Sequence, residues 1–144
     1  MNQEAATMLT RARATLILDQ PFFGALALKM PLIEDSGIKT LCVNGREVRY
    51  NPEFILGLSA SVCKAAMAHE VMHCVVDTFG RQGGRNHRKW NQASDYAINQ
   101  ILQDVGFELG DGWLIAPMFK DMSAEEIYTM LPDEPDDGGG NGHG

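Results

Sequence analysis

Residues 67–75 read MAHEVMHCV and contain the pattern His69-Glu70-x-x-His73. Residues four apart on an α-helix lie on one face, one turn apart, so two imidazoles at this spacing can reach the same ion. Glu70 lies about 100° around such a helix from His69, where a carboxylate can touch a metal-bound water without binding the metal. This spacing predicts a metal site carried by a helix.

The residues around the pattern predict that this helix is buried. They are mainly apolar and include Ala65, Ala66, Met67, Val71, Met72, Val75 and Val76. Two histidines and a glutamate are unfavourable in apolar surroundings unless they are paired or bind a metal. The competing interpretation is a core helix whose polar side chains only hydrogen-bond to their neighbours.

Zinc is the metal that these side chains suit best. It binds imidazole nitrogen and, in catalytic sites, keeps one position for water, whose pKa falls to about 7. A nearby carboxylate can then take the proton of that water. The pattern therefore predicts Zn²⁺ as cofactor, His69 and His73 as ligands and Glu70 as the catalytic general base.

A catalytic zinc usually has a third protein ligand. The metzincin extension is excluded, because positions 76 and 79 are not glycine and histidine. Asp95 and His87 remain as downstream candidates. Asp77 is a weaker one, because three ligands on consecutive turns of one helix form an awkward chelate.

Asp95 is favoured over His87 by its surroundings. His87 lies in a loop rich in glycine and cations, which is a poor place to hold a ligand in zinc geometry. Asp95 lies in a predicted helix, and Asn99 follows it by four residues on the same face. Ligand histidines usually donate their other ring N–H to an oxygen. We therefore predict Asp95 as the third metal ligand, and Asn99 as the residue whose amide oxygen accepts a hydrogen bond from the other ring N–H of a ligand histidine.

Apolar periodicity and capping residues predict the helices. The predicted ranges are Glu4–Leu18, a short helix after Asn51-Pro52, a motif helix from Ser59 or Ser61 to Phe79, Asn91–Val105 and Ser123–Leu131. Pro21 is expected to end the first of them. Ser123 and Glu126 form a capping box at the start of the last.

Strand signals are fewer. Thr40–Tyr50 reads as a hairpin, because Asn44-Gly45 suits a type I′ turn between two apolar runs. Phe22–Met30 is predicted as a strand or a buried approach, and Phe107–Phe119 as an irregular segment with a short strand. Together the elements predict an α+β fold that is mainly helical, with a small antiparallel sheet and the motif on a central buried helix.

Length and composition predict one domain over residues 1–131. Residues 132–144 are rich in proline, aspartate and glycine, and we expect a disordered acidic tail or linker. The formal net charge of −7 gives no support for nucleic-acid binding. No apolar run reaches the length of a membrane span, so no membrane partner is expected. Three cysteines without CxxC spacing and the lack of a signal-like N-terminus favour a reducing, cytoplasmic compartment.

Two longer stretches resemble a known family. AHEVMHCVVDTFGR (residues 68–81) followed by WNQASDYAINQIL (residues 90–102) is similar to the predicted metallopeptidase domain at the N-terminus of bacterial von Willebrand factor A-like proteins. YNPEF, GF and SAEEIY fit the same pattern, so the resemblance covers about residues 4–131. It implies a zincin-like fold with His69, His73 and Asp95 as zinc ligands and Glu70 as catalytic carboxylate. It also implies a von Willebrand A-like domain or an ATPase as partner.

The leading functional hypothesis is a zinc-dependent metallopeptidase that hydrolyses a peptide or protein substrate. The alternative is a catalytically weak, metal-stabilised regulatory or interaction module, which would have no need of the general base Glu70. A third hypothesis is hydrolysis of a non-peptide amide. A peptide substrate is expected along an edge strand from Thr40–Tyr50 or Ala25–Met30, and Tyr50 or Tyr96 is a candidate for stabilising an oxyanion.

Overall fold

The computed structural model describes residues 2–44 and 46–133 of the chain. The helices and strands follow in the order α1 (Gln3–Asp19), α2 (Pro21–Leu28), β1 (Leu32–Glu34), β2 (Leu41–Val43), β3 (Val48–Tyr50), α3 (Pro52–Leu56), α4 (Ala60–Val75), α5 (Thr78–Arg81), α6 (His87–Val105), the 3₁₀ helix η1 (Pro117–Phe119) and α7 (Ala124–Met130). The described chain is mainly helical, as predicted.

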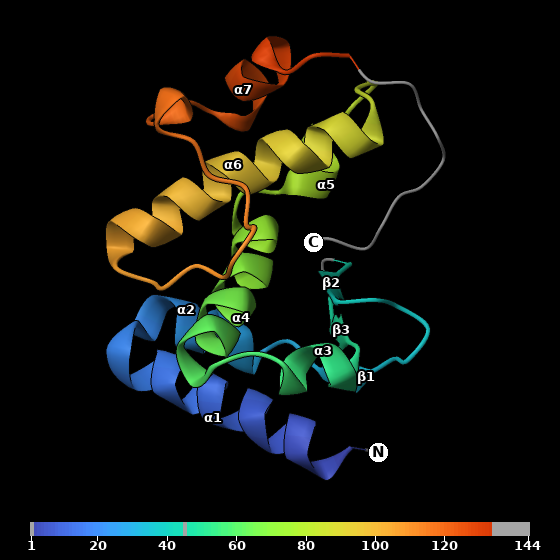
Figure 1. The fold of residues 1–144 in the computed structure, drawn as a ribbon, viewed down its shortest axis with the longest axis vertical. Coiled ribbons are helices and arrows are strands. Elements are labelled where there is room, and N and C mark those ends of the chain that lie inside the picture. Colours follow the sequence, from blue (N-terminus) through green and yellow to red (C-terminus); the bar gives the residue numbers. More distant parts are fainter. Residues whose placement is uncertain (1, 45, 134–144) are drawn as a thin grey trace.

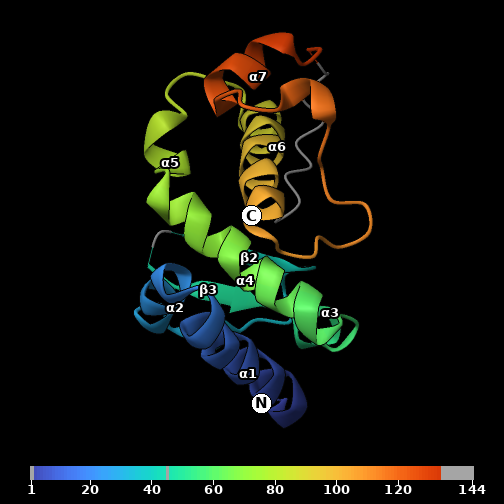
Figure 2. The ribbon, with the colours of Figure 1, turned by 90° about the vertical axis from the view of Figure 1, so that its left-hand side faces the viewer.

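The motif helix α4 runs through the centre of the molecule (Figure 1). α1 and α2 pack at one end of α4, and α6 crosses it toward the other end, with α7 on the far side of α6 (Figures 1 and 2). The small sheet lies beside α4, and β2 packs against that helix. This arrangement surrounds α4 with other elements and explains its burial.

Two hydrophobic clusters hold these elements together. The larger one joins α1, α2, the sheet, α3, α4 and part of α6, and includes the fully buried Leu9, Leu16 and Ile55. The smaller one lies between α6 and α7 around Phe119 and Ile127. The capping box predicted for α7 is present, since Ser123 and Glu126 each bond the other's backbone N–H.

α4 begins and ends at identifiable residues. The Ser59 side chain accepts a hydrogen bond from the backbone N–H of Val62, so Ser59 rather than Ser61 is the N-cap. The prediction that this helix continues to Phe79 is wrong. It stops at Val75, and Asp77 adopts a left-handed conformation with φ 54° before α5 begins. Aspartate is one of the few residues that tolerate this conformation.

The strand predicted at Phe22–Met30 is also wrong, because residues 22–28 lie in α2. The alternative of a buried segment holds in part, since Phe23, Ala27 and Met30 are buried while Phe22 and Leu28 are exposed. Pro21 does not only end the first helix; it occupies the first turn of the next one, where its missing N–H is harmless. Gly24 of α2 allows this helix to pack closely against α1. A Cβ atom at Gly24 would lie 2.5 Å from the Cα of Ile17.

The sheet is mixed rather than purely antiparallel, which corrects the prediction. β2 and β3 form the expected antiparallel pair, but β1 pairs with β3 in parallel, giving the order β1-β3-β2. The sequence pattern places Asn44 at the centre of the turn, and the structure does not. The backbone N–H of Asn44 donates to the carbonyl of Glu47, so Asn44 is the last residue before the loop. Gly45, on which the predicted turn type depends, lies outside the described residues.

The remaining predictions concern the C-terminal third. The short strand expected within Phe107–Phe119 is wrong, since this segment contains only η1 and irregular chain. Most of the tail expected to be disordered lies outside the described residues. No helix in the described part of the chain is long and apolar enough to cross a membrane.

Candidate metal centre

Three side chains of the motif are buried in the middle of α4. His69, Glu70 and His73 are 8%, 1% and 1% exposed. The Nε2 atoms of the two histidines lie 3.1 Å apart, as the four-residue spacing predicts. A carboxylate oxygen of Glu70 lies within 4.8 Å of the ligand nitrogen of each histidine. These side chains could hold a metal ion together.

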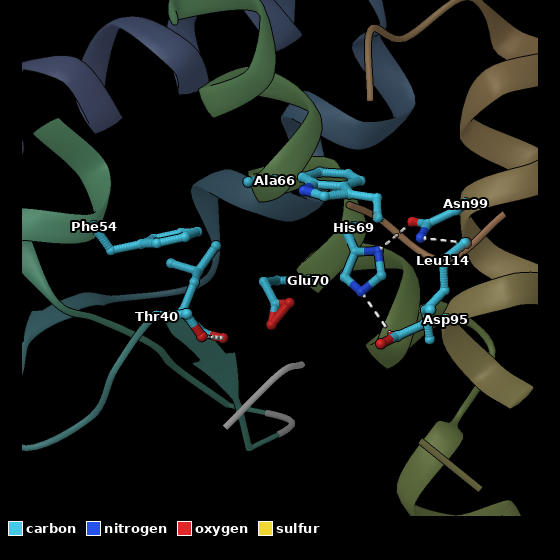
Figure 3. Close-up of a pocket in the computed structure, with 10 residues that line it drawn as sticks. Thr40, Phe54, Ala66, His69, Glu70, Asp95, Asn99 and Leu114 are labelled. Atoms are coloured by element: carbon cyan, nitrogen blue, oxygen red, sulfur yellow. Dashed lines mark hydrogen bonds and ion pairs between the residues drawn. The ribbon is translucent and has the colours of Figure 1, made fainter. Parts of the chain in front are cut away.

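α6 adds a carboxylate to this group. Oδ1 of Asp95 lies 3.0 Å from Nε2 of His69 and 3.2 Å from Nε2 of His73. Asp95 is 4% exposed, and Figure 3 shows it facing His69 across the junction of the two helices. The structure therefore brings the predicted third ligand to the two histidines.

The ligand atoms of His69, His73 and Asp95 form a triangle slightly smaller than the one expected around a small tetrahedral metal ion. Tetrahedral zinc with bonds of about 2.0–2.1 Å separates neighbouring ligand atoms by about 3.3–3.4 Å. The sides of the triangle formed by His69, His73 and Asp95 are 3.0–3.2 Å. A small ion above the plane of this triangle can contact all three atoms, so these side chains fit the metal that the sequence predicts.

The hydrogen bonds of Asn99 define the tautomer of His69. The Asn99 amide nitrogen donates to the carbonyl of Leu114 at 2.9 Å, so its oxygen is free to accept. That oxygen lies 2.8 Å from Nδ1 of His69, which must therefore carry the proton. In the neutral ring, Nε2 then presents a lone pair to Asp95 and His73. This is the orientation that a metal ligand requires.

The charge distribution of the centre favours a cation. Burial acts to raise the pKa of Asp95, but the adjacent His69 and His73 outweigh it and hold that pKa below its usual value. Asp95 is therefore a carboxylate at neutral pH. The imidazoles lower this pKa through positive charge and hydrogen bonds to the carboxylate, so without a proton on Nε2 the same contacts need another cation between them.

Glu70 differs from the other members of the group. Burial raises the pKa of Glu70 to about 7, while the two histidines act to lower it. Its Oε1 atom is buried without a hydrogen-bond partner among the described residues. An orphaned buried carboxylate oxygen is rare in folded proteins and is typical of functional sites. Its position and pKa suit a group that exchanges a proton.

A pocket opens onto this carboxylate. Its lining consists of Thr40, Leu41, Phe54, Ala66, His69, Glu70, Asp95, Asn99, Trp113 and Leu114. Its volume of about 30 Å³ is sufficient for a water molecule beside Glu70. Figure 3 shows Phe54 and Thr40 on one side of Glu70, with His69 and Asp95 on the other. The pocket thus connects the candidate metal centre to the sheet.

β2 borders the pocket with an unpaired edge. The bonds of Thr40 and Asn44 to the neighbouring strand show that alternate residues of this segment face β3. The backbone N–H and C=O groups of Leu41 and Val43 therefore point to the other side, where no strand pairs with them among the described residues. An extended peptide could bind along this edge.

The other candidates from the sequence lie elsewhere. His87 is exposed at the start of α6, with Nδ1 2.9 Å from Oε1 of Gln82. The Asp77 side chain accepts from the N–H of Gly80 and caps α5. Tyr96 packs its ring on Phe119 in the smaller cluster. Tyr50 is 3% exposed in the larger cluster and does not line the pocket.

Several residues of the site were not predicted from the sequence. Thr78 contacts His73, the Trp113 ring lies 5.7 Å from that of His69, and Phe54 lines the pocket. Trp113 lies in an irregular segment, where no periodicity indicates its orientation. Thr78 follows the motif closely, but only the break after α4 turns it toward the metal centre.

The fold and the site together define a mainly helical domain with a buried His/Glu/His group that could hold a metal ion. A family model described as "Putative metallopeptidase domain" matches residues 4–144, and the chain belongs to this family. Comparison with curated proteins and with solved structures finds no match. The resemblance to a metallopeptidase family is thereby confirmed, and the description of this family suggests a metal-dependent hydrolase. The von Willebrand A-like or ATPase partner stays a prediction.

Proposed function

We propose that this chain is a zinc-dependent peptidase whose ion is held by His69, His73 and Asp95. The observation that carries the proposal is the convergence of three ligand atoms within 3.0–3.2 Å beside Glu70, whose buried Oε1 has no hydrogen-bond partner among the described residues. The family description supports the same class of reaction. Cys42, Cys63 and Cys74 form no disulfide in the described part of the chain, which suits a reducing compartment such as the cytoplasm.

Glu70 is the general base of the proposed reaction. When bound, zinc supplies a Lewis acid that polarises the scissile carbonyl and makes water a better nucleophile at neutral pH. Glu70 accepts the proton of the attacking water and delivers it to the amine nitrogen of the leaving group. Burial, which raises the pKa of Glu70, favours its protonated form after the first step, and a bound cation would favour its return to the carboxylate.

The substrate binds as an extended strand beside β2. The outward-facing N–H and C=O groups of Leu41 and Val43 would pair with its backbone, and the Thr40 hydroxyl, which now donates to the Leu41 carbonyl, would give way. Such pairing recognises a peptide without demanding a particular sequence. The pocket between Phe54 and His69 would then receive the scissile bond. The other segment predicted for this role, Ala25–Met30, lies mainly in α2 and has no strand edge to offer a substrate.

Wild-type protein and Glu70→Gln test this function directly. Glutamine preserves the shape of the side chain but cannot accept the proton. We expect both proteins to carry about one zinc per chain in elemental analysis, and only the wild type to cleave a broad peptide library at a measurable rate. The expected loss of rate is about 10²- to 10⁴-fold.

Two results would contradict the proposal. Glu70→Gln cleaving as fast as wild type would remove the general base from the mechanism. A zinc-loaded wild type that cleaves no peptide would favour the alternative of a metal-stabilised regulatory or interaction module, in which the metal serves folding only.

A further inference from the structure

The break between α4 and α5 brings a buried hydroxyl to the second histidine. α4 stops at Val75, and the left-handed conformation of Asp77 turns the chain so that Thr78 starts α5. Oγ1 of Thr78 then lies 2.9 Å from Nδ1 of His73. Thr78 is 2% exposed, so water does not compete freely for this bond. A continuous helix would carry residue 78 past His73.

Thr78 is itself held by α6. The indole Nε1 of Trp90 donates a hydrogen bond of 2.8 Å to the backbone carbonyl of Thr78. Trp90 is completely buried, and Arg85 lies 5.1 Å above its ring. The turn before Thr78 is also bonded, because Asp77 accepts from the N–H of Gly80. Thr78 is therefore held in place through its backbone, and its side chain is directed at the imidazole.

This bond orients the metal-binding nitrogen of His73. When Nδ1 of the neutral ring carries the proton and donates it to Thr78, Nε2 presents its lone pair to the centre of the site. Nε2 lies 3.1 Å from Nε2 of His69 and 3.2 Å from Oδ1 of Asp95. The side-chain oxygen of Asn99 orients His69 in the same way, because it accepts a hydrogen bond from Nδ1 of that ring.

We propose that Thr78 is a positioning residue for His73, and that Trp90 fixes Thr78 for this task. The inference rests on the proposed metal site. It adds that α6 supports both histidines, one directly through Asn99 and the other through Trp90 and Thr78. Loss of such an outer hydrogen bond typically weakens metal binding about 10- to 100-fold.

Thr78→Val and Thr78→Ser separate the hydroxyl from the packing of the side chain. Valine keeps the shape of threonine and loses the hydroxyl, whereas serine keeps the hydroxyl and loses the methyl. We expect Thr78→Val to bind Zn²⁺ and Co²⁺ about 10- to 100-fold more weakly in competition with a chelator. Its Co²⁺ absorption bands should also shift. Thr78→Ser should match the wild type in both measurements.

Thr15→Val is the matched control, because its hydroxyl bonds only the carbonyl of Arg11 on the exposed surface of α1. It should leave metal binding unchanged. Thr78→Ala serves as a second hydroxyl-free variant if Thr78→Val does not fold.

Three results would overturn the inference. Hydroxyl-free variants with wild-type affinity and an unchanged Co²⁺ spectrum would refute it while leaving the proposed function intact. A loss in Thr78→Ser as large as in Thr78→Val would show that packing, not the hydroxyl, matters. A wild type that binds neither ion would remove the proposed metal site and this inference with it.

Discussion

Oδ1 of Asp95 lies 3.0 Å from Nε2 of His69, although the two residues are 26 positions apart on different helices. The crossing of α4 and α6 creates this contact, and both side chains are buried there. α6 also carries Asn99 and Trp90, which support the two histidines. The geometry of the candidate metal centre therefore depends on how these two helices pack.

The first prediction concerns the third ligand. Asp95→Ala should release zinc, because it removes one of three ligands together with its negative charge. His87→Ala should leave the zinc content unchanged, since His87 is exposed and bonded to Gln82. Elemental analysis of the two purified variants measures the difference. An empty site in His87→Ala together with a full one in Asp95→Ala would reverse our assignment.

The second prediction concerns the support of His69. Asn99→Ala should keep the three ligands but weaken zinc binding about 10- to 100-fold, because Nδ1 of His69 loses its acceptor. Asn91→Ala is the matched control, since the Asn91 side chain contacts His87 instead. Competition with a chelator of known affinity measures the zinc affinity of both variants. Equal affinities of these two variants would mean that Asn99 has no such role.

The third prediction concerns folding. A metal that binds only the native state stabilises it, by about 2.7 kcal/mol when free zinc is 100-fold above its dissociation constant. Removing zinc from the wild type should therefore lower its thermal midpoint, and adding zinc back should restore it. His73→Ala should show neither response. A midpoint that is the same with and without zinc in the wild type would argue against a metal bound to the folded chain.

The fourth prediction concerns the contact of α1 with α2. Gly24→Ala should destabilise the protein by about 1–3 kcal/mol, because the new Cβ atom would lie 2.5 Å from the backbone of Ile17. Gly57→Ala is the control, since the nearest atom to its Cβ would be at 3.6 Å. Denaturant unfolding compares the two variants. Equal stability of the two variants would show that α1 and α2 make room for the extra methyl group without loss of stability.

The elements confirmed from the sequence are those with strong local signals. The helix beginning at Ala124 follows its capping box, and the pairing of Leu41–Val43 with Val48–Tyr50 follows the hairpin pattern. α2 was mispredicted because a short apolar run has no periodicity that separates a strand from a buried helix. The parallel pairing of β1 depends on a partner 16 residues away, as in Leu32 with Val48, which no local pattern indicates.

The sequence by itself determined that His69, Glu70 and His73 lie close together, because the α-helix places residues one turn apart on one face whatever surrounds it. It only favoured Asp95 over His87, it offered the segment of β2 as one of two possible edge strands, and it gave no sign of Thr78. Those features were decided by the tertiary structure. Contacts between distant segments depend on how whole helices and strands pack, and local periodicity carries no information about that packing.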